Sequence, residues 1–118
     1  MLPKVNRAGR NELDVFFSSD PAKKKVFQTT HSPLFLVKST KTENEGSKFA
    51  FVVSSSVEKT AVGRNLIKRR ARAIVARLLP NLKDGHTIMF IFKKPAVLAT
   101  FDELKRDIEG VLTKLGLP

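Results

Sequence analysis

Two long segments repeat their apolar residues with the period of an α-helix. The first segment spans residues 61–79, where apolar residues recur every three or four positions and would form one stripe along a helix. The members of this stripe are Ile67, Ala71, Ile74, Val75 and Leu78. Thr60 is a candidate N-cap, and Pro80 marks the end of the segment. The pattern therefore predicts a long amphipathic helix.

The second segment lies near the C-terminus and predicts another helix, beginning at or near Thr100 and ending at Gly116. Its apolar face consists of Phe101, Leu104, Ile108, Val111, Leu112 and Leu115. A third, short helix is predicted over residues 11–17, where the apolar residues stand at 13, 16 and 17. We expect each helix to bury its apolar side against a common core.

Four other segments are typical of β-strands. Residues 24–30 predict a weak strand, 34–40 a better one, and 86–93 the clearest. The continuous apolar run 49–54 predicts a central strand covered on both faces. The polar segment 41–48 predicts a hairpin loop. Because the strands are grouped rather than strictly alternating with helices, the fold class expected is α+β, with helices packed on one sheet.

The length and composition favour one folded domain. The chain has 118 residues, 42% of them hydrophobic and 28% charged, and we expect residues 1–118 to form a single domain. Residues 1–9 are basic and predict an extended arm. There is no Cys, which excludes disulfides and cysteine-based metal sites. No apolar run resembles a signal peptide or a membrane span, so we expect a cytoplasmic protein that does not bind membranes.

The charge of the chain narrows the class of partner. Twenty-two Lys and Arg against eleven Asp and Glu leave a formal net charge of +11. So large an excess on a small domain is typical of proteins that bind nucleic acid. From Arg64 to Arg77 the predicted long helix contains no acidic residue, whereas a solvated helix face would mix both signs.

A helical wheel separates the cations of this helix from its apolar stripe. Arg64, Lys68 and Arg72 fall at i, i+4 and i+8 and therefore line one ridge. Asn65 and Arg69 lie next to that ridge. Arg70 and Arg77 lie on the opposite flank of the stripe. Such a helix can dock on its own core by one side while the ridge follows a phosphate backbone.

The remaining residues show no pattern typical of a catalytic or metal-binding site. His31 and His86 have no Cys or regularly spaced carboxylates beside them, so we expect no metal site and no catalytic residue on this chain. Phe16 and Phe17 are adjacent on a short predicted helix, which leaves one of them as a candidate base-stacking residue.

The predicted long helix resembles the signature helix of the bacterial ribonuclease P protein subunit. The segment Ala61-Val-Gly-Arg-Asn-Leu-Ile-Lys-Arg-Arg-Ala-Arg72 is similar to the family motif Ala-Val-x-Arg-Asn-x-x-Lys-Arg-x-x-Arg. The similarity extends over nearly the whole chain. It includes residues 1–4, 15–16, 35–37, 51–57, 86–92 with Pro95, and 101–104.

This resemblance implies a fold and a function. The fold is a two-layer α/β sandwich ordered αβββαβα, with a left-handed βαβ crossover, similar to domain 2 of ribosomal protein S5. The function is that of the protein subunit of ribonuclease P, which assists a catalytic RNA in removing the 5′ leader of precursor tRNA. The implied holoenzyme contains one protein and one RNA, and its Mg²⁺ is bound mainly by the RNA.

The resemblance also assigns roles to particular residues. Contacts with the catalytic RNA are expected from Arg64, Asn65, Lys68, Arg69, Arg70, Arg72 and Lys59. A cleft for the single-stranded leader is expected to include Phe16, Phe35 and Lys38.

The chain departs from the family at several of these positions. Ser55 and Ser56 stand where the family usually has two lysines, and Glu58 is close by. Lys38 and Glu12 replace aromatic residues, so leader recognition is expected to depend more on phosphate contacts than on stacking.

Two other classes remain open at this point. A ribosomal or ribosome-assembly protein would have similar size and charge, and a DNA-binding regulator would place the basic helix in a major groove. The regulator is disfavoured because no helix-turn-helix pattern is found.

Overall fold

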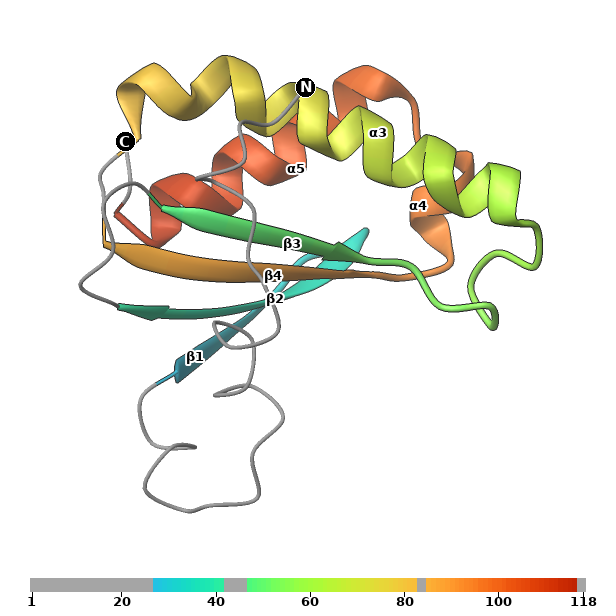
Figure 1. Ribbon diagram of the computed structural model, residues 1–118, viewed down its shortest axis with the longest axis horizontal. Coiled ribbons are helices and arrows are strands. Elements are labelled where there is room, and N and C mark those ends of the chain that lie inside the picture. The colour runs from blue at the N-terminus through green and yellow to red at the C-terminus, as the bar shows by residue number, and fades with distance from the viewer. Residues whose placement is uncertain (1–26, 42–46, 83–84, 117–118) are drawn as a thin grey trace.

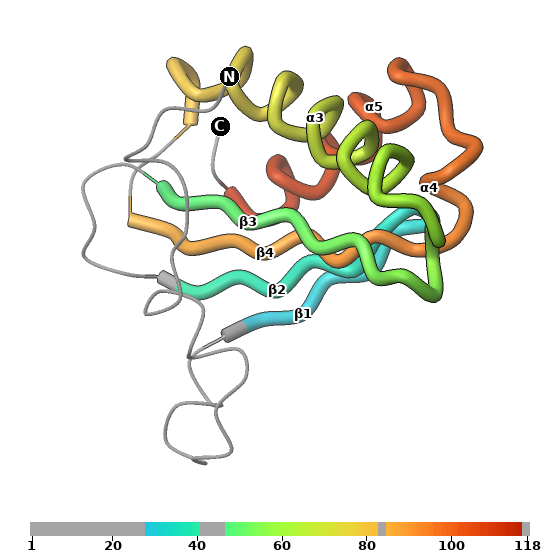
Figure 2. The backbone as a smooth tube through the Cα atoms, turned by 45° about the vertical axis from the view of Figure 1, so that its right-hand side comes forward, coloured from blue at the N-terminus to red at the C-terminus, as the bar shows by residue number. Residues whose placement is uncertain are grey.

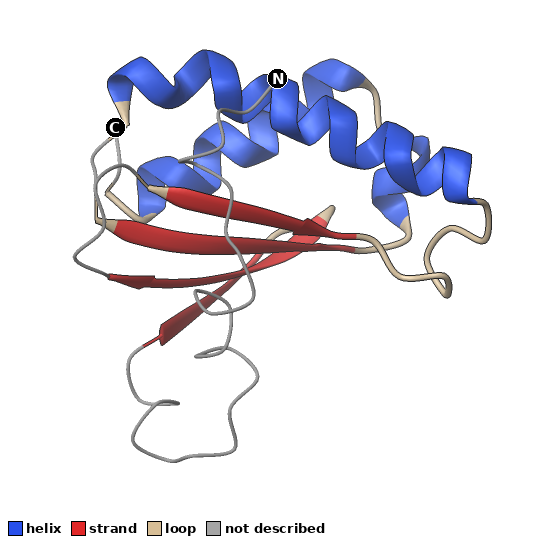
Figure 3. Cartoon of the chain, in the orientation of Figure 1, coloured by secondary structure: helices blue, strands red, loops and turns tan. Residues whose placement is uncertain are grey.

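The computed structural model describes residues 27–41, 47–82 and 85–116. In chain order the elements are β1 (Phe27–His31), β2 (Phe35–Lys41), β3 (Lys48–Val52), α3 (Ala61–Leu78), the 3₁₀ helix η2 (Leu79–Asn81), β4 (His86–Phe92), α4 (Pro95–Leu98) and α5 (Phe101–Lys114). Figure 3 distinguishes these helices and strands by colour. The predicted arm 1–9 and the predicted helix 11–17 lie outside the described residues. The four predicted strands and the two long helices are confirmed, with small shifts at their ends, and α4 was not predicted.

The four strands form one sheet in the order β1-β2-β4-β3 (Figure 1). Strand β2 pairs antiparallel with both β1 and β4, whereas β3 pairs parallel with β4. Because β4 lies between β2 and β3, the prediction of a hairpin over residues 41–48 is wrong. The prediction of a central strand at 49–54 is also wrong, since β3 lies at an edge of the described sheet. Strand β4 is longer and almost wholly buried, so burial favours β4 in the interior.

The connection from β3 to β4 runs through α3. Parallel neighbours cannot be joined by a tight turn and need a crossover, which α3 supplies as it passes over the sheet (Figure 2). The left-handed sense of this crossover, implied by the resemblance, stays a prediction.

Helices α3 and α5 lie side by side on one face of the sheet, which makes the two-layer α+β sandwich expected (Figures 1 and 2). Alternate strand residues point toward these helices, and the largest of them are fully buried aromatic side chains. Phe35 and Phe90 meet edge to face, with ring centroids 5.2 Å apart. Ile74 of α3 and Ile108 of α5 belong to the same buried core on the helical side of the sheet. The core therefore fixes which side of each helix is left for solvent.

Candidate nucleic-acid interface

Helix α3 presents its cations because its apolar stripe is buried. Thr60 caps the helix as predicted, accepting a hydrogen bond from the Gly63 N–H at 3.0 Å. Ile67, Ala71 and Ile74 of the stripe are buried against the sheet and α5, together with Val75. Leu78 is only partly buried and packs at the edge of the same core. The rest of the helix circumference is therefore available to carry charge.

The cations of α3 are exposed or half-buried, and none has an acidic partner among the described residues. Asn65, Arg69 and Arg72 are exposed, and Lys68 and Arg70 are half-buried. The first turn contains no acidic residue, and within the described residues no cation of α3 forms an ion pair. Like charges at i and i+4 destabilise a helix by roughly 0.2–0.5 kcal/mol per pair. A bound polyanion would relieve that repulsion, so the helix is electrostatically suited to nucleic acid.

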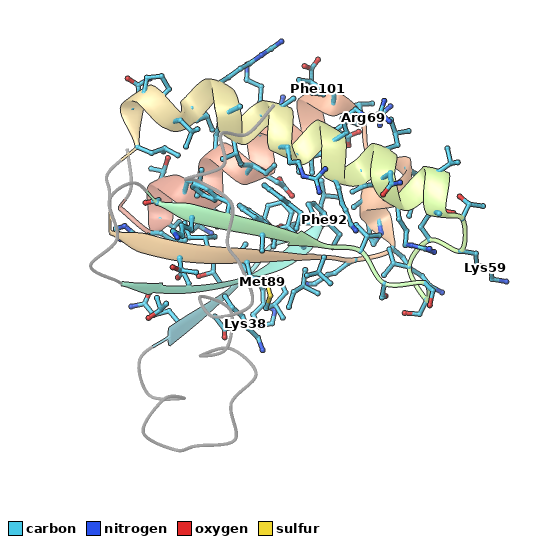
Figure 4. All side chains as sticks on the ribbon, in the orientation of Figure 1. Lys38, Lys59, Arg69, Met89, Phe92 and Phe101 are labelled. Carbon is cyan, nitrogen blue, oxygen red and sulfur yellow. The ribbon has the colours of Figure 1, made fainter. Side chains whose placement is uncertain are left out.

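Two of the predicted contact residues lie at different places, one near the middle of α3 and one in the loop before it. Lys59 is exposed and extends into solvent from the loop beyond the helix N-terminus (Figure 4). Arg69 projects from the upper side of the helix, away from the sheet (Figure 4). The cationic surface therefore continues from the helix onto the loop that precedes it.

The opposite flank of α3 has a different role. The guanidinium of Arg77 lies 5.9 Å from the ring centroid of Phe101, the first residue of α5. An arginine over an aromatic face gains a cation–π attraction of about 0.5–1 kcal/mol at an exposed site. Arg77 therefore helps to join the two helices, which agrees with its predicted place away from the ridge.

Arg64 is already bonded within the protein. Its Nη1 donates to the backbone carbonyls of Glu58 and Lys59, each at 2.9 Å. The sequence alone did not predict this contact. No side-chain pattern indicates it, because the two acceptors are backbone carbonyls in the loop before the helix. Arg64 consequently has a structural partner in addition to its predicted contact with RNA.

The placement of Phe35 corrects the prediction that it lines a leader cleft. Its side chain is 0% exposed and packs under α3 and α5. Phe90 and Phe92 contact its ring edge-on at centroid distances of 5.2 and 5.8 Å. A side chain enclosed in this way cannot reach a bound RNA, because the register of β2 turns it toward the helices.

Lys38 lies on the other face of the sheet. In register it stands opposite Met89 of β4, and both side chains point away from the helices (Figure 4). Met89 is fully buried and Lys38 is half-buried. The structure therefore separates Lys38 from Phe35, while Phe16, the third predicted cleft residue, lies outside the described residues.

The described ranges 27–41, 47–82 and 85–116 offer no other kind of site that the sequence would allow. No group of three or more His, Cys, Asp or Glu is placed to hold a metal ion there. The buried Nδ1 of His86 has no hydrogen-bond partner among the described residues, whereas His31 is exposed. Over the same ranges, none of the helices has the length and apolar character that a bilayer-crossing segment requires.

A two-layer α+β sandwich that exposes a cationic helix without acidic residues is typical of a nucleic-acid-binding protein. The family model described as Ribonuclease P matches residues 19–116. This chain belongs to the ribonuclease P protein family.

Individual relatives agree with this assignment. A ribonuclease P protein component of Pseudanabaena sp. is 35% identical over 114 residues, covering 97% of this chain and 94% of the relative. One from Beutenbergia cavernae is 41% identical over 73 residues, covering 62% of this chain and 60% of the relative.

Solved structures show the same fold. A mutant of the Staphylococcus aureus RNase P protein superposes with a TM-score of 0.81 and 21% identity, covering 98% of this chain and 92% of that one. The RNase P protein of Thermotoga maritima gives a TM-score of 0.75 and 22% identity, covering 92% of this chain and 96% of that one. At these identities the likeness establishes the fold alone.

Proposed function

We propose that this chain is the protein subunit of ribonuclease P and that α3 is the surface that binds the catalytic RNA. In this role the protein assists removal of the 5′ leader of precursor tRNA, which generates the mature 5′ end. The holoenzyme is expected to hold one copy of this chain per RNA. Family membership supports the role, and the arrangement of α3 supports the assignment of the surface.

The observation that carries the proposal is a row of cations on α3 that forms no ion pair with any described residue, on a helix whose other side is buried in the core. Lys68 and Arg72 lie one turn apart on this row, with Arg69 beside them, and none has an acidic partner in the described part of the chain. Each cation that neutralises a phosphate releases condensed counterions, so binding should weaken steeply with added salt. A helix that had evolved only for stability would place acids among these cations.

The direct test is reconstitution of the holoenzyme. The purified chain is mixed with a bacterial ribonuclease P RNA and 5′-labelled precursor tRNA at a magnesium concentration too low for efficient cleavage by the RNA alone. We expect the wild-type protein to stimulate cleavage at the mature 5′ end, and Lys68→Ala/Arg72→Ala to stimulate it less at the same protein concentration. RNA alone and protein alone are the controls.

The outcomes of this experiment discriminate between classes of protein. RNA binding without stimulated cleavage would favour a ribosomal or ribosome-assembly protein and would contradict the proposal. Stimulation that is unchanged in Lys68→Ala/Arg72→Ala would retain the function but reject α3 as the binding surface.

The proposal places the cleavage chemistry on the RNA. Magnesium bound mainly by that RNA would supply the activated water, and this chain would bind and orient the substrates. Accordingly, we expect the RNA to retain slow cleavage at high magnesium without protein, and the protein to cleave nothing without RNA. Cleavage of precursor tRNA by the purified protein alone would contradict this division of labour.

Recognition of the leader is a separate part of the proposal. Lys38 is the charged residue that β2 places on the sheet face opposite α3, so it can contact leader phosphates while α3 holds the catalytic RNA. We expect Lys38→Ala to reduce the affinity gained from a longer leader. Lys105→Ala on α5 is a matched control, because that lysine lies on the outer side of the helical layer. Unchanged leader dependence in Lys38→Ala would reject this contact.

A further inference from the structure

The loop between β3 and α3 is held in a defined conformation at both ends. At its start, the carbonyl of Ser54 accepts hydrogen bonds from the N–H groups of Val57 and Glu58, both at 3.1 Å. Val57 also packs its side chain against the hydrophobic core. At its end, a carboxylate oxygen of Glu58 accepts from both the N–H and the hydroxyl of Thr60, each at 3.1 Å. Lys59 lies between these anchored residues and is exposed.

Arg64 closes this arrangement from the helix. Both hydrogens of an arginine Nη are used when that nitrogen donates to two acceptors, and Nη1 of Arg64 donates to the carbonyls of Glu58 and Lys59. This nitrogen therefore has no hydrogen left for a phosphate. By contrast, no hydrogen bond within the described residues engages the side chain of Lys68 or Arg72. Arg64 thus differs from the other members of the cationic row.

Gly63 provides the space that the arrangement requires. A Cβ at this position would lie 2.6 and 2.7 Å from the Cδ and Cγ of Glu58 and 2.8 Å from the Thr60 hydroxyl. A glycine in a helix costs roughly 0.5–1 kcal/mol relative to alanine. The close approach of the Glu58 side chain gives a physical reason for glycine in the first turn of α3.

We propose that Arg64 is a positioning residue, which holds the Glu58–Thr60 segment against the start of α3 and so presents Lys59 to the RNA that Lys68 and Arg72 bind. The inference rests on the proposed function. A lysine on a pre-ordered backbone loses less conformational entropy on binding than one on a free loop, so its contact contributes more to affinity. A residue that acted only through its own charge would contribute independently of Lys59.

A double-mutant cycle on RNA affinity separates these two roles. Binding to a bacterial ribonuclease P RNA is measured for the wild type, Lys59→Ala, Arg64→Ala and the double variant. We expect Lys59→Ala to weaken RNA affinity several-fold in the wild type but less than about twofold in the Arg64→Ala background. A difference between backgrounds that exceeds about twofold is larger than independent substitutions usually show. In the Arg72→Ala background, the matched control, Lys59→Ala should cost as much as in the wild type.

A second variant disturbs the same loop without changing any charge. Gly63→Ala should displace the Glu58 side chain, and we expect it also to reduce the cost of Lys59→Ala. In the free protein, amide hydrogen exchange over residues 57–60 should be faster in both Arg64→Ala and Gly63→Ala. Exchange over residues 67–75 should remain unchanged, which would show that both variants are folded.

Several outcomes would overturn the inference. Equal costs of Lys59→Ala in the wild-type and Arg64→Ala backgrounds would assign Arg64 an independent contact with RNA. A cost-free Lys59→Ala in the wild type, or unchanged exchange over residues 57–60, would remove the basis for positioning. Complete failure of the wild type to bind this RNA would instead overturn the proposed function itself.

Discussion

Helices α3 and α5 pack on the same face of the same sheet, yet their exposed sides differ in how charges are distributed. Helix α5 has Asp102 and Glu103 in its first turn and Lys114 in its last, which places acids at the positive end of the helix dipole and a base at the negative end. Lys105 and Glu109 also form an i, i+4 ion pair across its surface, at 3.9 Å. Helix α3 has no acid in its first turn and no ion pair within the described residues. The charges on α5 therefore stabilise the helix itself, whereas those on α3 are suited to binding a polyanionic partner.

The N-caps of the two helices show the same difference at atomic scale. In α5, Thr100 accepts from the Glu103 N–H, and Glu103 accepts in return from the Thr100 N–H at 2.9 Å, which completes a capping box. In α3 the residue equivalent to Glu103 is Gly63, and the returning carboxylate comes from Glu58 upstream of the cap. The carboxylate that bonds the N-cap N–H thus lies within the helix in α5 but in the preceding loop in α3. This leaves the first turn of α3 free of negative charge while its N-cap remains bonded.

The largest expected effect concerns what the two helices share, their buried stripes. Ile74 of α3 and Ile108 of α5 are both almost completely buried in one core. We expect Ile74→Ala and Ile108→Ala each to lower the free energy of unfolding by about 2–5 kcal/mol, because each leaves a cavity. Urea denaturation measures both, with Lys105→Ala as an exposed control. A cost near zero for Ile74→Ala would contradict the packing of α3 described above.

The next largest effect concerns the contribution of each helix's cations to RNA binding. We expect Lys68→Ala/Arg72→Ala in α3 to reduce the slope of log affinity for ribonuclease P RNA against log salt by about two units. The matched pair Lys105→Ala/Arg106→Ala in α5 should leave that slope nearly unchanged. Filter binding over a series of salt concentrations provides the measurement. Equal slopes for the two double variants would break the comparison, since the cations of α3 would then neutralise no more phosphates than those of α5.

Removal of the N-caps should have a smaller effect on stability and a different effect on function. Thr60→Ala and Thr100→Ala each remove a side-chain cap, which typically costs about 1 kcal/mol of unfolding free energy. Only Thr60→Ala should also weaken RNA binding, because the Thr60 hydroxyl is bonded to Glu58 in the loop that carries Lys59. Thermal unfolding and RNA titration of the two variants test this. Equal RNA affinities would show that the loop conformation does not matter to binding.

The smallest expected effect is the pH dependence of the α5 cap. The hydrogen bond from the Thr100 backbone N–H, followed by that to its side chain, lowers the pKa of Glu103 below the ordinary value of a glutamate. A carboxyl with a depressed folded-state pKa contributes stability above its unfolded pKa, and this is lost as the pH falls through the folded value. Unfolding measured from pH 7 downward should therefore show less loss below about pH 4.3 in Glu103→Gln than in the wild type. Parallel curves for the two proteins would contradict a lowered pKa of Glu103 in the folded protein.

How far the sequence predicted the site differs from residue to residue. The Thr60 cap, the buried stripe of α3 and the acid-free row of cations followed from local spacing, and the structure confirms that stripe and cap. Phe35 was misassigned because a strand has two faces, and the apolar run 34–37 does not indicate which face meets the helices. Arg64 was assigned by its place in the motif, which carries no information about the loop carbonyls that its Nη1 contacts.

The sequence by itself determined the two long helices, their N-caps, their apolar stripes and the uncompensated charge of α3. These features depend on interactions between residues three or four positions apart, which a linear pattern contains. Only the tertiary structure decided that β4 lies between β2 and β3, that Phe35 is enclosed and Lys38 is on the opposite face, and that Arg64 holds the loop before α3. Strand order depends on pairing between segments up to 57 residues apart, such as Phe35 and Phe92. The contact of Arg64 depends on the path of an irregular loop. Neither produces a periodic pattern in the sequence.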